Sequence, residues 1–253
     1  MKFSFFNIKN KKNKIALGIC VLNEGKKIRD QLRILSQKKI NNLVDIIICD
    51  ANSNDGSIDI PFLKKKGVNK LLLKRCSGKL SRQIQIIIHH SIKERYEGLI
   101  LVDGNNKDDM KFIKKFIDKI YNKFDYVHGS RYIKNGYEKN TPIIRKLLTK
   151  YFHPFIFNIG NKFKFSDTAN GYRGMSKKFI ILNKEKIFKK YFIHYNLQYF
   201  LTRLSLKRNF KTCEIGVGRY YKKIHLRLKS HTSGIGYFIV LKDLILTKIG
   251  FYD

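Results

Sequence analysis

At 253 residues the chain is long enough to bury a sizeable core as one large α/β domain, with or without a C-terminal extension. It carries 53 Lys and Arg against 19 Asp and Glu, a formal net charge of +34, which calls for an anionic partner or a cloud of counter-ions. Nucleic acid, anionic lipid and phosphorylated substrates all satisfy that requirement. The basic residues are spread along the chain, so we expect most of them to form a solvated basic surface.

The composition also argues against two classes of protein. No segment has the features of a signal peptide, and no apolar stretch reaches the roughly 18 uncharged residues that a membrane span needs. The four cysteines lack the spacing of metal ligands, so we expect buried thiols in a reducing compartment. The sequence therefore favours neither an integral membrane protein nor a disulfide-stapled secreted domain.

The first half of the chain alternates short aliphatic runs with amphipathic stretches. Strands are predicted at residues 14–22, 44–49, 70–74, 98–102 and 126–129. Helices are predicted at about residues 26–37, 79–94 and 109–124, with a short helix before the third strand. This alternation is typical of a mainly parallel sheet flanked by helices.

The second half of the chain is less regular. We expect helices at residues 177–183 and about 197–206, and a last strand at residues 213–221. Residues 147–165 and 236–252 are rich in apolar and aromatic side chains with lysines among them, a composition typical of interfacial or amphipathic segments. Packing of both segments onto the domain itself is the alternative.

The expected organisation is one catalytic domain with basic extensions. We place a basic N-terminal tail at residues 1–13, an α/β domain at residues 14–230 and an amphipathic C-terminal helix at residues 231–253. No internal repeat and no linker rich in Pro or Ser divides the chain.

Two of the predicted strands end on acidic side chains. The aliphatic run at residues 99–102 is followed by Asp103, Gly104 and Asn105, and the strand at residues 44–49 is followed by Asp50. Ligands of α/β proteins collect beyond the carboxyl ends of such strands. A carboxylate in this position suits Mg²⁺ or Mn²⁺ bound to a diphosphate, because these ions take one or two carboxylates and fill the remaining positions with water and phosphate.

Alternatives to a metal-nucleotide site exist for these residues. Asp50 and Asp55 flank a cluster of Asn, Ser and Gly that any turn would accept. The sequence lacks the GxSxG, GxxxxGKS/T, GxGxxG and HExxH motifs, which argues against serine hydrolases, P-loop enzymes, dinucleotide dehydrogenases and zinc peptidases. A nucleic-acid-binding protein is a remote alternative, based on the net charge and on basic-aromatic stretches such as the one that begins at Arg219. It leaves the two Asp-terminated strands unexplained.

Five motifs, in this order, resemble glycosyltransferase family 2. They are IALGICVLNE at 15–24, ICDANSNDGS at 48–57, VDGN at 102–105, HGSRY at 128–132 and DTANGYR at 167–173. Within that family the chain is similar to dolichyl-phosphate mannosyltransferase and related polyprenyl-phosphate sugar transferases of envelope polysaccharide or glycolipid synthesis. The resemblance spans about residues 14–230 and implies a GT-A fold, a GDP- or UDP-linked sugar donor and Mg²⁺ or Mn²⁺.

The resemblance also assigns the donor side of the site. It implies that Asn23, Glu24, Asp50 and Asp55 border the nucleotide sugar, and that Asp103 begins the metal-binding motif. The second acidic position of that motif is occupied by the amide Asn105, with Asp108 or Asp109 nearby as substitutes. Basic side chains after the last strand could close over the diphosphate: Lys222, Lys223, His225 and Arg227.

On the acceptor side, the resemblance implies that Arg131, Arg145 and Thr149 hold the phosphate of a polyprenyl phosphate. Such an acceptor is already ionised and needs no general base. A saccharide hydroxyl acceptor, the alternative, would need one, and Asp167 is then the catalytic candidate beside Asp103. Direct displacement inverts the sugar. We expect a peripheral enzyme on the cytoplasmic face of the cell membrane, bound to anionic lipid and not to nucleic acid; an inactive family member is a further alternative.

Overall fold

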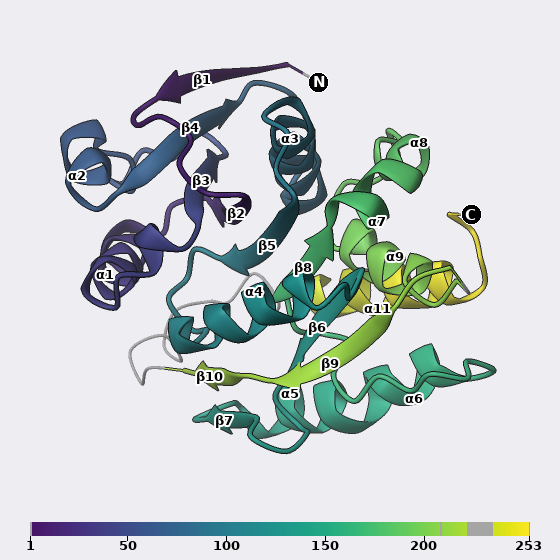
Figure 1. Ribbon diagram of the computed structural model, residues 1–253. Helices are drawn as coiled ribbons and strands as arrows, with labels where there is room; N and C mark the ends of the chain where they lie inside the picture. Colours follow the sequence, from purple (N-terminus) through teal and green to yellow (C-terminus); the bar gives the residue numbers. More distant parts are fainter. Residues whose placement is uncertain (1, 208, 222–234, 253) are drawn as a thin grey trace.

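The computed structural model describes residues 2–207, 209–221 and 235–252. Within these residues the centre of the molecule is an eight-stranded sheet with the order β1-β4-β3-β2-β5-β8-β6-β9 (Figure 1). Its strands are β1 (Phe3–Asn7), β2 (Ile15–Val21), β3 (Asp45–Asp50), β4 (Val68–Lys74), β5 (Gly98–Asp103), β6 (Tyr126–Ser130), β8 (Arg173–Ser176) and β9 (Thr212–Gly216). Strand β1 is antiparallel to β4, and β8 is antiparallel to β5 and β6. The other neighbours are parallel, as the sequence predicts.

A small second sheet pairs β7 (Tyr137–Lys139) with β10 (Gly218–Tyr220). The helices are α1 (Gly25–Gln37), α2 (Ile60–Lys65), α3 (Leu80–Lys93), α4 (Ile113–Tyr121), α5 (Ile143–Leu147), α6 (His153–Asn158), α7 (Lys177–Leu182), α8 (Lys184–Ile187), α9 (Asn196–Leu204) and α11 (Ile235–Lys248). Short 3-10 turns η1 (Ile40–Asn42) and η2 (Met110–Phe112) precede β3 and α4, and the π-helical turn η3 (Leu148–Phe152) joins α5 to α6.

The sheet separates two hydrophobic cores, because successive side chains of a strand point to opposite faces. Leu17 and Ile19 of β2 belong to the core beneath α1 and α4, whereas Ala16 belongs to the core formed with α3, α9 and α11 (Figure 1). Between them, Gly18 lets α3 approach the strand closely: a Cβ there would lie 2.6 Å from the side chain of Ile87. Both faces of the central strands are therefore covered, which explains their continuous aliphatic runs.

The N-terminal segment and β8 differ from the predictions. The expected tail at residues 1–13 is wrong in part, because β1 pairs with β4 at the sheet edge and Phe3 packs against His89. Strand β8 was not predicted, because it reads Arg-Gly-Met-Ser and has no aliphatic run. It is a strand because it fills the space between β5 and β6. The predicted last strand is divided at Val217 into β9 and β10.

The two segments of interfacial composition, at residues 147–165 and 236–252, each pack one side on the domain. Helix α11 contacts α9 and α6 and buries Leu244 and Thr247 completely. The segment at residues 147–165 forms η3 and α6, which bury Phe157, while several neighbouring apolar side chains stay exposed. Among the helices that the structure describes, none is long and apolar enough to cross a membrane.

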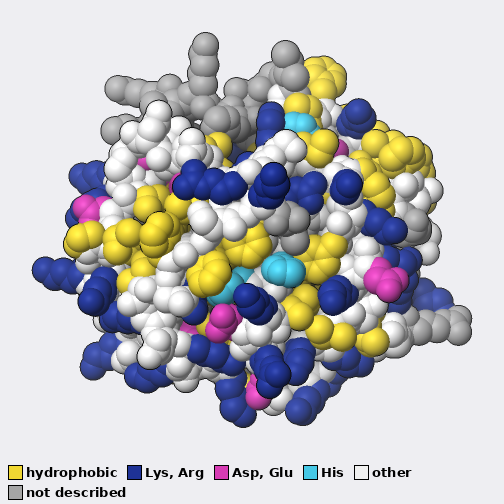
Figure 2. Space-filling view, turned by 90° about the horizontal axis from the view of Figure 1, so that it is seen from above, with side chains coloured by type: hydrophobic (Ala, Val, Ile, Leu, Met, Phe, Trp, Pro, Cys, Tyr) yellow, Lys and Arg dark blue, Asp and Glu magenta, His cyan; other side chains and the backbone are white. Residues whose placement is uncertain are grey.

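The four cysteines are free thiols, but only Cys49 is fully buried. Cys20, Cys76 and Cys213 are partly exposed, so the expectation of buried thiols is correct for one of the four. The molecular surface is basic over a broad area. Figure 2 shows Lys and Arg side chains scattered among apolar and polar ones on the face seen from above, with few Asp or Glu. This distribution matches the solvated basic surface that the sequence predicts.

Candidate functional site

The carboxyl ends of β2, β3 and β5 meet at one edge of the sheet. Val21 pairs with Asp50 on one side of β2, and Cys20 pairs with Asp103 on the other. The predicted convergence of the two Asp-terminated strands is therefore confirmed. The antiparallel strand β8 begins at the same edge and brings Gly171 beside Asp103, where a Cβ would lie 3.1 Å from the Oδ1 atom of Asp103.

Asp103 is partly accessible at this edge, with a side chain 27% exposed. Its Oδ2 accepts hydrogen bonds from Arg219 Nη2 at 3.2 Å and from Asn105 Nδ2 at 3.4 Å. The Oδ1 atom of Asn105 accepts one from the backbone N of Lys107 at 3.2 Å. Gln31 of α1 holds the backbone carbonyl of Asp103 at 3.0 Å. The hydrogen bond from Gln31 thus fixes the backbone at the end of β5, while the carboxylate of Asp103 stays partly exposed.

Arg219 of β10 lies between two carboxylates. Its Nη1 donates to Asp108 Oδ1 at 2.7 Å, and its Nη2 reaches Asp103. Burial raises the pKa of the Asp108 carboxyl, and the charge of Arg219 opposes that shift. Within the described part of the chain, the second oxygen of Asp108 has no hydrogen-bond partner. This role of Arg219 was not predicted, since only its place at the end of a predicted strand pointed to the site.

Basic side chains converge on the ring of Tyr221, next to Arg219. The Nζ atom of Lys107 lies 4.9 Å from the ring centroid, and the guanidinium carbons of Arg145 and Arg219 lie 5.7 and 5.8 Å from it. Burial alone would raise the pKa of Tyr221, but the nearby arginines lower it to about 8. The three cationic side chains around this one ring give this part of the site a positive potential, which favours binding of a phosphate group.

Hydrogen bonds hold the loop after β3 in place and connect it to the loop after β2. Asp50 is buried, and its Oδ2 accepts from the backbone N atoms of Asn52 and Ser53, each at 2.9 Å. Asn23 Oδ1 accepts from the backbone N of Asn54 at 3.0 Å, and Asn23 itself has a left-handed φ of 51°. The carboxylate of Asp50 therefore supports its own loop, as the turn interpretation predicts.

Glu24 and Asp55 have similar local partners. Glu24 forms an ion pair with Lys27 at 2.8 Å, and its backbone N donates to the hydroxyl of Ser57 at 2.9 Å. Asp55 Oδ1 accepts from the backbone N of Ser57 at 3.0 Å. Together the two loops form one hydrogen-bonded wall on the β2–β3 side of the edge.

The predicted acceptor residues lie on the other side of Asp103. Arg131 and Asp167 form a buried two-pronged ion pair, with Nε to Oδ2 at 2.7 Å and Nη2 to Oδ1 at 2.8 Å. Burial would raise the pKa of Asp167, but Arg131 outweighs it and holds the pKa below its usual range. The pair engages both oxygens of Asp167, so Asp167 can act as a base only if the pair breaks, whereas Nη1 of Arg131 takes no part in it.

Arg145 and Thr149 are brought together as predicted. Thr149 lies one turn after Arg145, and its hydroxyl donates to the carbonyl of Arg145 at 2.9 Å. The same hydroxyl is 2.7 Å from the hydroxyl of Tyr132, which follows Arg131. The Nε atom of Arg145 donates to the hydroxyl of Tyr237 on α11 at 3.2 Å. Arg145 therefore links the site to α11 as well as to Tyr221.

A divalent ion fits the donor set at Asp103. The described residues contain no group of three or more His, Cys, Asp or Glu that could enclose a metal. A Mg²⁺ or Mn²⁺ ion that binds with a diphosphate needs fewer protein ligands, and Asp103 with the amide oxygen of Asn105 suffices. Asp109 is not available, because its carboxylate caps η2 and accepts from Tyr137. Lys222, Lys223, His225 and Arg227 lie outside the described residues.

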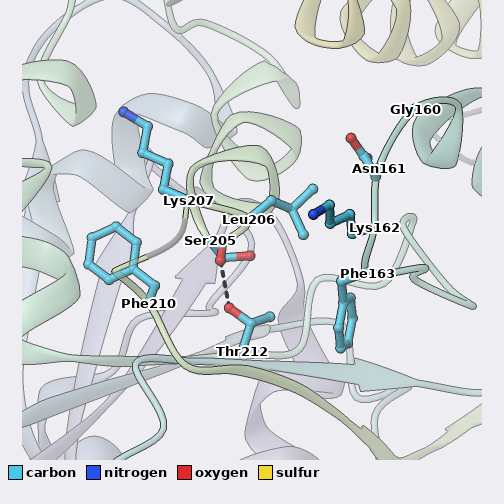
Figure 3. Close-up of a pocket in the computed structure, with 9 residues that line it drawn as sticks. All are labelled: Gly160, Asn161, Lys162, Phe163, Ser205, Leu206, Lys207, Phe210 and Thr212. Atoms are coloured by element: carbon cyan, nitrogen blue, oxygen red, sulfur yellow. Dashed lines mark hydrogen bonds between the residues drawn. The ribbon is translucent and has the colours of Figure 1, made fainter.

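A separate hollow of about 420 Å³ lies between the loop at residues 160–163 and the segment from Ser205 to Thr212 (Figure 3). Thr212 begins β9, so this hollow is at the opposite end of the strands from Asp103. Among the described residues that line it are Lys162 and Lys207, and none of these residues is a carboxylate. It offers no chemistry comparable to that of the sheet edge.

The mixed sheet, with β8 reversed beside β5 and an Asp at the end of β5, matches the GT-A fold of nucleotide-diphospho-sugar transferases. Glucosyl-3-phosphoglycerate synthase of Mycobacterium tuberculosis has this fold. Its complex with Mn²⁺, UDP and glucosyl-3-phosphoglycerate matches with a TM-score of 0.62 at 11% identity, over 93% of this chain and 80% of that one. Its complex with Mn²⁺, UDP-glucose and phosphoglyceric acid gives 0.63 at 12%, over 93% and 79%. No protein-family model and no curated protein matches the sequence. The predicted fold class is confirmed.

Proposed function

We propose that the chain is an inverting glycosyltransferase of family 2 that transfers a sugar from a nucleoside diphosphate to a membrane-associated acceptor. The main support is the position of Asp103. Its carboxylate is partly exposed at the end of a buried strand and lies beside the cationic side chains around Tyr221. The GT-A fold supports it, as do the UDP and Mn²⁺ or Mg²⁺ bound in the similar synthase.

The donor diphosphate gains negative charge as the sugar leaves, and two features of the site would stabilise that charge. Asp103 and Asn105 would hold Mg²⁺ or Mn²⁺, which supplies Lewis-acid stabilisation of the leaving diphosphate. Lys107 and Arg219 add fixed positive charge on the same side. The hydrogen-bonded wall formed by the β2 and β3 loops, with Asn23, Glu24, Asp50 and Asp55, would border the nucleoside.

For the acceptor we favour a lipid phosphate such as a polyprenyl phosphate. Its oxygen is already ionised, so no side chain has to remove a proton. Arg145 is the residue we assign to that phosphate, with Thr149 beside it. Arg131 and Asp167 act as positioning residues, because their ion pair fixes the backbone between β6 and Tyr132. A saccharide hydroxyl acceptor is less well supported, since it would require Asp167 as a free base.

Binding and transfer assays test the proposal. Nucleoside diphosphates, with GDP and UDP compared, should stabilise the protein against thermal unfolding, and Mg²⁺ or Mn²⁺ should increase the shift. Asp103→Ala should abolish transfer and the metal-dependent shift but keep the circular dichroism spectrum, because Arg219 retains Asp108 as a partner. Asp118→Ala, an exposed carboxylate on α4, is the matched control. Retained turnover in Asp103→Ala would remove the basis of the proposal.

A further inference from the structure

The helical run from α5 through η3 to α6 has an apolar outer face. Ile144, Leu147, Tyr151 and Phe155 are spaced by three or four residues, so they lie on one side of the run, and all four are exposed. Phe155 is 71% exposed. Water-facing sides of surface helices are ordinarily polar. From Ile144 to Phe155, over about three helical turns, the water-facing side is apolar instead.

Helix α11 lies alongside this run and extends the same kind of surface. Its start is bound through the hydrogen bond from Arg145 to Tyr237, and its end through that from Lys248 Nζ to the carbonyl of Phe157, at 3.2 Å each. The two helical segments are therefore parallel neighbours. Phe238, 74% exposed, and Ile249 are apolar side chains that α11 leaves in water.

We use the term apolar platform for the exposed apolar side chains of these segments: Ile143, Ile144, Leu147, Tyr151, Phe152, Phe155, Ile159, Phe238, Ile245, Ile249 and Phe251. Single exposed apolar residues are common, but an extended group of them marks an interaction surface. Aromatic and aliphatic side chains of this kind partition into the boundary between lipid headgroups and acyl chains.

The charges around the apolar platform indicate what covers it. Residues 142–165 contain five Lys and Arg and no Asp or Glu. In residues 235–252 the single acidic residue is Asp243, which is buried. The exposed cations Lys150, Lys162 and Lys242 therefore have no competing carboxylate within these segments. This surface complements a negatively charged one.

We propose that the apolar platform docks on the surface of an anionic lipid bilayer, with its side chains in the headgroup region and without spanning the membrane. The helix that begins the platform also carries Arg145, whose guanidinium lies near Tyr221 in the site. Docking therefore brings the acceptor side of the site to the membrane surface. That last step rests on the proposed function, whereas docking itself does not.

Vesicle flotation tests the docking. The full-length protein should float with vesicles containing phosphatidylglycerol at low salt, bind phosphatidylcholine vesicles more weakly, and dissociate as salt rises. The triple variant Ile144→Ser, Leu147→Ser, Phe155→Ser should lose at least about tenfold in partitioning, since it removes three apolar side chains that enter the lipid interface on docking. Removal of Lys150 and Lys162 by substitution with Gln should cost about fivefold per charge.

The control is a double variant at the far edge of the sheet. Phe5 and Phe6 of β1 are 46% and 45% exposed, so Phe5→Ser, Phe6→Ser removes comparable apolar surface without touching the apolar platform. It should partition like the wild type. Equal partitioning of the triple variant and the wild type, or no flotation of the wild type, would overturn the docking proposal. So would self-association of the wild type in solution that the triple variant abolishes, because the surface would then bind a second copy.

Nucleotide binding separates this proposal from the proposed function. The triple variant should bind a nucleoside diphosphate with unchanged affinity in calorimetry, because none of its substitutions touches Asp103 or Tyr221. Thermal unfolding checks that the variant is folded. If the wild type floats but binds no nucleotide, docking holds and the proposed function fails; the opposite result rejects docking alone.

Discussion

The two sides of the functional edge are constructed differently. On the β2–β3 side, Asp50 and Asp55 bond to backbone groups two or three residues away, and Asn23 reaches only the neighbouring loop. On the β5–β6 side, charged side chains pair across 36 residues, as in Arg131 with Asp167, and across 116, as in Arg219 with Asp103. The first side is a wall of hydrogen bonds that involve backbone groups, some within one loop and others between the two loops, whereas the second is a set of ion pairs between distant segments.

This difference has an energetic meaning. A loop hydrogen bond contributes about 1 kcal/mol, because water competes for the same groups. A buried ion pair gains little net stability, but loss of one partner leaves a desolvated charge and costs several times more. The β5–β6 side should therefore be the more sensitive to single substitutions, and the following predictions test that ranking.

The largest effect is expected for Arg131→Ala. It leaves the carboxylate of Asp167 buried without its ion-pair partner, and we expect a loss of about 3–5 kcal/mol in the free energy of unfolding. Urea denaturation measures it. The matched control is Lys178→Ala, which breaks a partly exposed pair with Asp125 and should cost less than about 1 kcal/mol. Similar losses in the two variants would contradict the distinction.

Asp50→Asn should have an intermediate effect. With the amide oxygen in the place of Oδ2, the bonds from the backbone N atoms of Asn52 and Ser53 remain, but the amide nitrogen in the place of Oδ1 cannot accept from the Ser53 hydroxyl. Loss of that bond and of the negative charge costs about 1–2 kcal/mol of unfolding free energy. The same denaturation experiment provides the value. A loss of unfolding free energy as large as that of Arg131→Ala would mean that the β2–β3 wall is as sensitive to substitution as the buried ion pair.

Nucleotide affinity should depend on pH through Tyr221. Its pKa of about 8 means that the phenol is neutral below pH 8 and negatively charged above it, where it competes with phosphate for the arginines. If the neutral form alone binds, affinity for a nucleoside diphosphate falls about tenfold between pH 7 and pH 9. Calorimetry on Tyr221→Phe should show a flat profile over this range. A decline that persists in the variant would assign the dependence to another group.

The smallest effect is expected for Asn105→Asp. A second carboxylate beside Asp103 should raise Mn²⁺ affinity by a few-fold, while Arg219 limits the gain by neutralising part of the added charge. Titration of Mn²⁺ followed by electron paramagnetic resonance measures it. A clear loss of affinity would show that the amide of Asn105 serves a purpose other than metal binding.

Much of the fold and part of the site follow from the sequence alone. The aliphatic runs of β2, β3 and β5 indicate strands buried on both faces, and their parallel pairing places Asp50 and Asp103 at one edge. The turn residues from Asn52 to Ser57 equally indicate the loop that Asp50 supports. These features depend on side-chain period and on bonds between near neighbours, which a sequence displays directly.

Tertiary structure decided the rest. Strand β8 has no aliphatic run and is a strand because β5 and β6 lie on either side of it. Nothing local to Arg219 shows that it will lie between Asp103 and Asp108, nor does the segment around Arg131 show that its guanidinium will be bound by Asp167. Such pairs form when the sheet brings distant segments together in a low-dielectric interior. There, charged groups need partners whatever their separation along the chain.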